Sequence, residues 1–139
     1  MKKIILLSIA CFFFSQIIHA HGSSLESFFN HYAEQDGFTY IYHGGGKALL
    51  GNIPSDIRKG LGSAKFIKKL SSSNAPADFI SNLKEILLKQ KFELVKMVKD
   101  DRSRIETYQK ESNDKYFDDV TIIINDTNIF IRWISGTAK

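Results

Sequence analysis

The residues of this chain that could carry acid–base or nucleophilic chemistry are few. Nucleophilic catalysis requires a nucleophile with a base beside it. The only cysteine, Cys11, lies in an N-terminal leader, and no Gly-x-Ser-x-Gly elbow occurs. The internal histidines His31 and His43 suit a helix surface and a strand end. We therefore expect no catalytic residue.

Two pairs of adjacent carboxylates are the next candidates. Asp100-Asp101 falls in a predicted turn, where aspartate is common for backbone reasons. Asp118-Asp119 falls in a predicted strand, where neighbouring side chains point to opposite faces. Neither pair is expected to line one site.

Metal binding is conceivable at a new N-terminus. Cleavage after Ala20 would give His21 a free amine beside its imidazole, with His31 or His43 as a further ligand. A disordered tail explains the same residues more simply. We predict no metal and no cofactor.

Gly44-Gly45-Gly46-Lys47 precedes a predicted short helix from Ala48 to about Asn52. Glycines before a helix can present N–H groups to an anion. The spacing is not that of a phosphate loop, and Ala48 replaces the hydroxyl residue. A plain strand-to-helix turn is the favoured interpretation.

Two sets of residues are candidates for a binding surface. The segment from Asn52 to Asn74 is predicted to be irregular and rich in positive charge, with a short edge strand from Ala64 to Leu70. It could contact an anionic surface or another envelope protein, or be only a solvated face. The candidates are Arg58, Lys59, Lys65, Lys68 and Lys69, together with the tyrosines Tyr40, Tyr42 and Tyr108.

Residues 1–20 have the order of a secretion signal. Lys2 and Lys3 precede an apolar run from Ile4 to Phe14, and Ala20 supplies the small residue before cleavage. The apolar run is shorter than the roughly 20 residues of a membrane span, so no transmembrane segment is expected after cleavage. A lipid anchor through Cys11 is the less favoured alternative. The sequence predicts an exported protein, periplasmic or associated with the cell envelope.

Residues 21–139 are long enough for one domain with its own core. Loss of Lys2 and Lys3 lowers the 19 basic residues by two, to 17, against 15 acidic ones, a net charge of +2. That small excess argues against nucleic-acid binding.

The C-terminal third predicts an antiparallel meander. Four β-prone runs, 92–98, 104–109, 116–124 and 128–134, are separated only by short polar links. The last two runs should be central, with Trp133 on their apolar face. Phe92 and Leu94 are out of phase with Val95 and Met97, which predicts a bulge or burial on both faces.

Helices are expected at 25–35 and 76–89, where apolar residues recur at helical spacing. Ser23 and Glu26 could form a capping box for the first helix. A strand from Phe38 to His43 follows it. The predicted fold class is α+β, with an antiparallel sheet of four to six strands and helices packed on one face.

This layout resembles domain-of-unknown-function family 4252, small exported proteins of Gram-negative bacteria. The resemblance is carried by Phe28-Phe29 with Tyr32, by the 37–42 strand, by Lys47 to Leu50, and by 120–124 through 129–136. It implies export and an α+β fold, and no site residues.

The sequence therefore favours a non-catalytic binding or interaction module of the cell envelope. The alternative is a hydrolase or a metal-dependent enzyme whose site cannot be recognised from the sequence. Exposed aromatic residues on an open sheet face would favour the module. A pocket that gathers His31, His43 and carboxylates would favour the enzyme.

Overall fold

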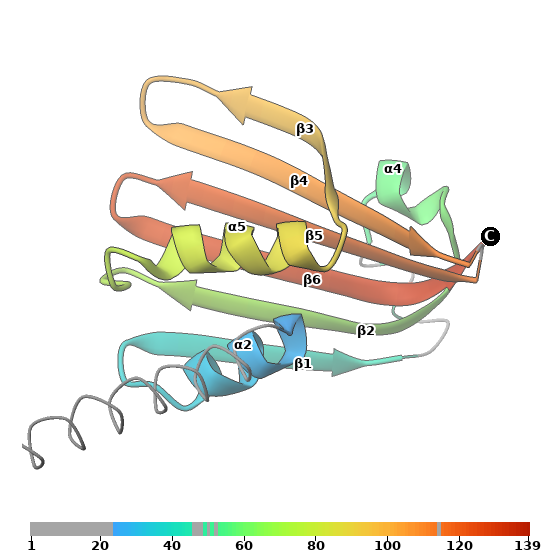
Figure 1. The fold of residues 1–139 in the computed structure, drawn as a ribbon, viewed down its shortest axis with the longest axis horizontal. Coiled ribbons are helices and arrows are strands. Elements are labelled where there is room, and N and C mark those ends of the chain that lie inside the picture. Colours follow the sequence, from blue (N-terminus) through green and yellow to red (C-terminus); the bar gives the residue numbers. More distant parts are fainter. Residues whose placement is uncertain (1–23, 46–48, 50, 52, 114) are drawn as a thin grey trace, which may run out of the picture.

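The computed structural model describes residues 24–45, 49, 51, 53–113 and 115–139 (Figure 1). The predicted leader with Cys11, the residues His21 and Ser23, and most of the predicted 48–52 helix lie outside the described residues.

The described chain forms one antiparallel sheet of six strands in the order β1-β2-β6-β5-β4-β3 (Figure 1). The strands are β1 (Phe38–Gly44), β2 (Leu61–Ser72), β3 (Glu93–Lys99), β4 (Ser103–Ser112), β5 (Tyr116–Asn125) and β6 (Asn128–Ala138). The predicted meander is confirmed, because β3 to β6 follow one another in space as in sequence, and β5 and β6 are central.

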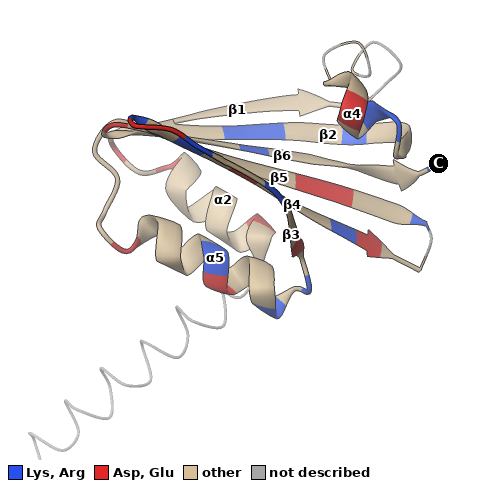
Figure 2. Ribbon diagram, turned by 90° about the horizontal axis from the view of Figure 1, so that it is seen from above, with Lys and Arg blue, Asp and Glu red and all other residues tan. Residues whose placement is uncertain are grey.

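Three described helices pack on this sheet. Helices α2 (Leu25–Ala33) and α5 (Phe79–Lys89) cover one face, which we call the helix face, whereas the short α4 (Ser55–Arg58) lies on the opposite face (Figure 2). The prediction of helices on one face therefore holds for the two longer helices and is wrong for α4.

Two hydrophobic clusters follow from the alternation of side chains across the strands. The larger lies under α2 and α5 and includes Phe29, Leu83, Ile122 and Ile131. The smaller packs on the opposite face and includes the members Ile57, Ile67, Phe117 and Ile134. Ile67 and Ile134 point away from α2 and α5. Apolar residues therefore fill both sides of the central strands.

The ends of α2 are fixed by specific hydrogen bonds. Ser24, and not Ser23, is the N-cap, and its Oγ accepts a hydrogen bond from the Ser27 amide at 3.0 Å. The Leu25 amide donates to Gln90 Oε1 at 3.2 Å, which joins the start of α2 to the end of α5. These bonds place Glu26, on the first turn of α2, at a defined position above the sheet.

Strand β2 differs most from expectation. The sequence predicts a short edge strand in an irregular segment, but β2 runs over 12 residues and pairs with both β1 and β6. Its pairing with β6 shifts between Leu61 and Ser63 and between Ala64 and Phe66, so Gly62 and Lys65 are extra residues in two bulges. Of the residues that suggested irregularity, Gly62 and Lys65 belong to these bulges, whereas Lys68 and Lys69 lie in the regularly paired part of the strand.

The true edge strands are β1 and β3. All seven residues of β3 are exposed, and its register shifts between Leu94 and Lys96. Of the two interpretations offered for the broken phase in 92–98, the bulge is confirmed and burial on both faces is wrong.

Candidate functional site: an aromatic trough with a buried lysine

The helix face is open at one end of the sheet. Helices α2 and α5 lie over one end and the middle, and the strand ends near the C-terminus of the chain extend beyond them (Figure 1). A cavity of about 850 Å³ lies here, between the first turn of α2 and strands β1, β2, β4, β5 and β6. We call this cavity the trough. Its volume is in the range of small-molecule sites.

The two bulges of β2 shape this end. Because Lys65 is an extra residue, both it and its neighbour Phe66 line the trough, which regular alternation would forbid. Across the ladder, Gly136 of β6 lets the strands approach closely, since a Cβ there would overlap the carbonyl oxygen of Ser63. The trough thus depends on local irregularities of β2 and on a close approach of β6.

Aromatic rings form much of the lining. Phe66 packs edge-to-face on Trp133, with ring centroids 4.8 Å apart, and Tyr42 lies 6.2 Å from Phe66 on its other side. Tyr116 and Tyr42 are 53% and 55% exposed. The rings come from four strand segments far apart in sequence, and they leave aromatic surface open to solvent.

Lys68 is the main charged group of the lining. It is 7% exposed, and its Nζ lies 4.7 Å from the centroid of the Phe66 ring and 5.0 Å from that of Trp133. Two such contacts partly compensate for the lost hydration of the ammonium. None of the ion pairs in the described part of the chain involves Lys68. A lysine with a mostly buried side chain and no ion pair among the described residues therefore lines the trough.

The trough also contains acidic groups. Asp118 Oδ1 accepts a hydrogen bond from Trp133 Nε1 at 2.9 Å, which fixes the indole ring. Glu26 lines the trough from α2, and the exposed Lys65 lines it from the β2 bulge. With Lys68, the described part of the lining carries two positive and two negative side chains, which is not the composition of a general anion-attracting surface.

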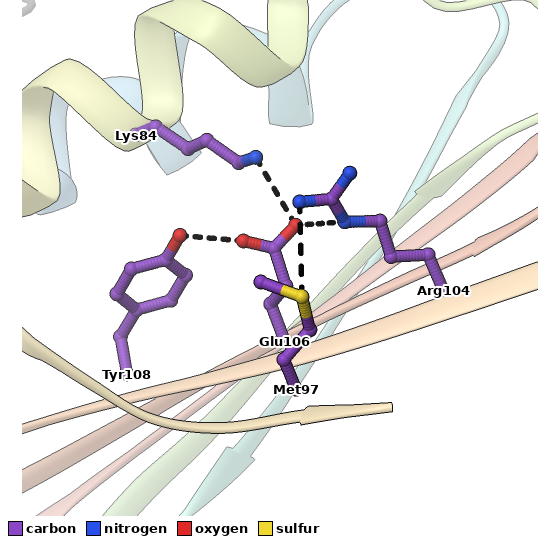
Figure 3. A network of polar contacts seen from close by, with 5 residues as sticks. All are labelled: Lys84, Met97, Arg104, Glu106 and Tyr108. Carbon is purple, nitrogen blue, oxygen red and sulfur yellow. Dashed lines mark hydrogen bonds and ion pairs between the residues drawn. The ribbon is translucent and has the colours of Figure 1, made fainter. Parts of the chain in front are cut away.

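A second cluster of charges lies at the covered end of the same face (Figure 3). Glu106 of β4 is 1% exposed and accepts a hydrogen bond from the Tyr108 hydroxyl at 2.6 Å. Lys84 of α5 lies 3.1 Å from its other oxygen, Oε2, and Arg104 Nε lies 2.7 Å from that same oxygen. The Arg104 contact has the distance of an ion pair without the alignment of a hydrogen bond.

These partners determine the titration of the Glu106 cluster. Burial by itself raises the pKa of Glu106, but the hydrogen bonds from Tyr108 and Lys84 and the charges of Lys84 and Arg104 outweigh it, so the pKa is lowered. Burial, followed by the bond to Glu106 and its charge, raises the pKa of Tyr108 far above its usual value. Glu106 is thus held as a carboxylate by two cations and one hydroxyl.

A third polar cluster lies on the opposite face. Asp119 is fully buried and accepts hydrogen bonds from Gln109 Nε2 at 2.8 Å and from Thr121 Oγ1 at 3.2 Å. Arg132 donates to Thr121 Oγ1 at 3.2 Å. Burial raises the pKa of Asp119 although Gln109, Arg132 and Thr121 act in the other direction. The expectation that Asp118 and Asp119 point to opposite faces is confirmed.

The carboxylates Asp100 and Asp101 lie where the sequence predicts them. Asp100 Oδ1 accepts hydrogen bonds from the Arg102 amide at 2.9 Å and the Ser103 amide at 2.8 Å. These bonds lower the pKa of Asp100. The turn interpretation of this pair is confirmed.

The predicted basic set does not form one patch. Lys65 and Lys68 line the trough, whereas Lys69 follows Lys68 on β2 and so points to the opposite face. Arg58 and Lys59 are exposed at the end of α4, also on the opposite face (Figure 2). The interpretation as a single mobile basic segment is therefore wrong.

The predicted tyrosines also separate. Tyr42 lines the trough. Tyr40 is half-buried beside α2, and burial, followed by Tyr42 and Glu26, raises its pKa. Tyr108 is buried with its hydroxyl on Glu106, so it cannot belong to an exposed surface.

The two internal histidines are not brought together. His31 is exposed on α2, where its ring meets that of Tyr32, while His43 alternates with Tyr42 on β1 and so points away from the helix face. In the described part of the chain, no group of three or more His, Cys, Asp or Glu residues is placed to hold a metal ion.

Among the helices of the described residues, none is both long and apolar enough to cross a membrane.

Sequence reasoning missed Phe66 as a site residue and missed both buried carboxylates. Phe66 lay in the stretch predicted to be irregular, although the aromatic residue between Lys65 and Lys68 was a signal for a half-buried strand. For Glu106, the polar character of 104–109 was visible, but nothing in the sequence pairs it with Lys84, 22 positions earlier on another element.

Comparison of the chain with protein-family models, with curated proteins and with solved structures finds no match in any of the three. The resemblance to family 4252 is thus not tested by them and stays a prediction.

Proposed function

We propose that the protein is an exported, non-catalytic binding module of the cell envelope, and that it binds a small ligand in the trough. The observation that carries this proposal is the open, ring-lined cavity at the uncovered end of the helix face. A concave site with aromatic walls and a few polar groups is the usual form of a ligand site.

The composition of the trough supports binding over catalysis. Among the described residues, its lining contains serines, aromatic rings, two lysines and two carboxylates, and no histidine or cysteine that could serve as a base or thiolate partner. The hydrogen bond from Trp133 to Asp118 fixes a ring, and the Ser63 and Thr137 hydroxyls bond to each other at 2.6 Å, so neither contact places a base beside a nucleophile.

Export rests on the order of features in residues 1–20, and membership of family 4252 remains part of the same proposal. Intact-mass measurement of the envelope-extracted protein tests the export step. A chain that begins at His21 is expected. A retained Met1, or a lipid on Cys11, would contradict it.

The chain contains a single tryptophan, Trp133, and it lies in the trough. Its fluorescence therefore reports occupancy without a label. Titration of the purified protein with the neutral aromatic probe N-phenyl-1-naphthylamine should quench this emission saturably.

A matched pair of variants on β1 locates the binding. Tyr42→Ala removes a trough ring, and Ile41→Ala removes an exposed side chain of the other face of the same strand. Loss of one stacking contact should weaken binding about three- to tenfold in Tyr42→Ala. Binding should be unchanged in Ile41→Ala. Equal effects of the two substitutions, or no saturable quenching, would contradict a site in the trough.

A further inference from the structure

We propose that the ligand of the trough carries one anionic group, a carboxylate or a phosphate, and that this group binds the Lys68 ammonium. The inference rests on the proposed function and specifies the chemistry of the same site.

The starting observation is the burial of Lys68 without an anionic partner. The side chain is 7% exposed, and its ammonium has two aromatic rings beside it and no ion pair among the described residues. Charged side chains in covered positions are as a rule paired, and Glu106, on the same face of the sheet, follows that rule with two cations and a hydroxyl. The Lys68 ammonium is not among the fully buried polar atoms, so its stem is covered while the charge faces the open trough, where an anion can reach it.

The neighbouring carboxylates do not supply the missing anion. Asp118 accepts the indole N–H of Trp133, and Glu26 lies on α2 beyond ion-pairing distance of Lys68. Both line the same cavity. A ligand anion can therefore approach Lys68 from the open side of the trough.

The rest of the lining limits the ligand class. Phe66, Trp133 and Tyr42 offer ring faces to a flat or apolar portion of the ligand, and the hydroxyl of Ser135 lies on the same face of β6 as Trp133. Glu26 and Asp118 would repel a second or third anionic group. The favoured ligand is thus a small ring-containing molecule with a single anionic group, and not a polyanion such as nucleic acid or acidic polysaccharide.

Three probes of one shape separate charge from stacking. They are 2-naphthamide, which is neutral, 2-naphthoate, which carries a carboxylate, and 2-naphthyl phosphate. Isothermal titration of the purified protein should show at least one of the two anions binding about tenfold or more tightly than the amide, the size of effect typical of a bond to a charged group. Which anion binds more tightly distinguishes the carboxylate from the phosphate.

Strand β2 offers a matched pair of variants. Lys68→Met should abolish the preference for the anions and leave amide binding unchanged, because methionine keeps the apolar stem. Lys69→Met changes the adjacent lysine, which points to the other face, and should keep the full preference. Lys68→Arg should retain part of it.

The outcomes separate the two proposals. Equal affinities for amide and anions, with Tyr42→Ala weakening both, would overturn the anion site and leave the binding module intact. Equal losses in Lys68→Met and Lys69→Met would show a general charge effect and also overturn it. Failure of all three probes to bind would overturn both proposals.

Discussion

Lys68 and Glu106 are two buried charges on the same face of one sheet, and they differ in what surrounds them. Glu106 lies under α5, where Lys84 and Arg104 form ion pairs with its carboxylate and Tyr108 donates a hydrogen bond to it (Figure 3). The Lys68 ammonium lies beside two rings and an open cavity, without an ion pair among the described residues. The paired charge joins a helix to the sheet, whereas the charge without an ion pair is available to a ligand.

The largest expected effect is the loss of stability on replacing Glu106, which lies under α5. Glu106→Ala should lower the free energy of unfolding by about 3–5 kcal/mol, since it leaves the partners of a buried ion pair uncompensated. Glu111→Ala, an exposed carboxylate on the same strand, should change it by less than about 0.5 kcal/mol. Urea melts measure both. A loss in Glu106→Ala no larger than in Glu111→Ala would show that the cluster does not hold the fold together.

Trp133 contacts both the core under the helices and the trough. Its replacement should have an intermediate effect on the free energy of unfolding. It packs on Phe29 of the covered core and on Phe66 of the trough, and it is only half-buried. Trp133→Ala should therefore cost about 2–3 kcal/mol, below the roughly 3–5 kcal/mol of a fully buried aromatic. Denaturant melts followed by circular dichroism test this. A loss below about 1 kcal/mol would place Trp133 outside the core.

The pH dependence of stability should distinguish Glu106, whose pKa is lowered, from Asp119, whose pKa is raised. The lowered pKa of Glu106 means that its stabilising contribution is complete above the unfolded value of about 4.5 and is lost as the pH falls through the lower folded pKa. The advantage of the wild type over Glu106→Gln should therefore shrink on acidification.

Asp119 should behave in the opposite way. Its raised pKa means that the folded protein holds the proton more tightly than the unfolded chain, so the charged form is destabilising at neutral pH. The stability of the wild type relative to Asp119→Asn should rise as the pH falls through the raised pKa. Urea melts between pH 7 and pH 3 compare the wild type with Glu106→Gln and with Asp119→Asn. Parallel trends would contradict the opposite pKa shifts of the two carboxylates.

The smallest expected effect is that of Lys68→Met on stability. Since the ammonium has no ion pair to lose, the free energy of unfolding should stay within about 0.5 kcal/mol of the wild type or increase. Lys69→Met is the control on the other face. A loss above about 1 kcal/mol in Lys68→Met alone would make Lys68 a structural residue like Glu106, and it would remove the contrast between the two sites.

Local patterns in the sequence determined the elements of the fold. Alternating apolar residues in 116–124 and 128–134 predicted two central strands, and the same alternation placed Asp118 and Asp119 on opposite faces. The broken phase at Phe92 to Met97 predicted either a bulge or burial on both faces, and β3 has the bulge. These features depend on neighbours within a few residues, which a single sequence displays directly.

Only the tertiary structure decided which charges are buried and which of them are paired. Pairing of β2 with both β1 and β6 sets Lys68 between Tyr42 and Trp133, residues 26 and 65 positions away. The bulge at Lys65 turns Phe66 toward the same cavity, and α5 carries Lys84 to Glu106. A lysine in a charged stretch and a glutamate in a polar strand resemble solvent-exposed residues in sequence, because burial is determined by what packs over a residue and not by its own type.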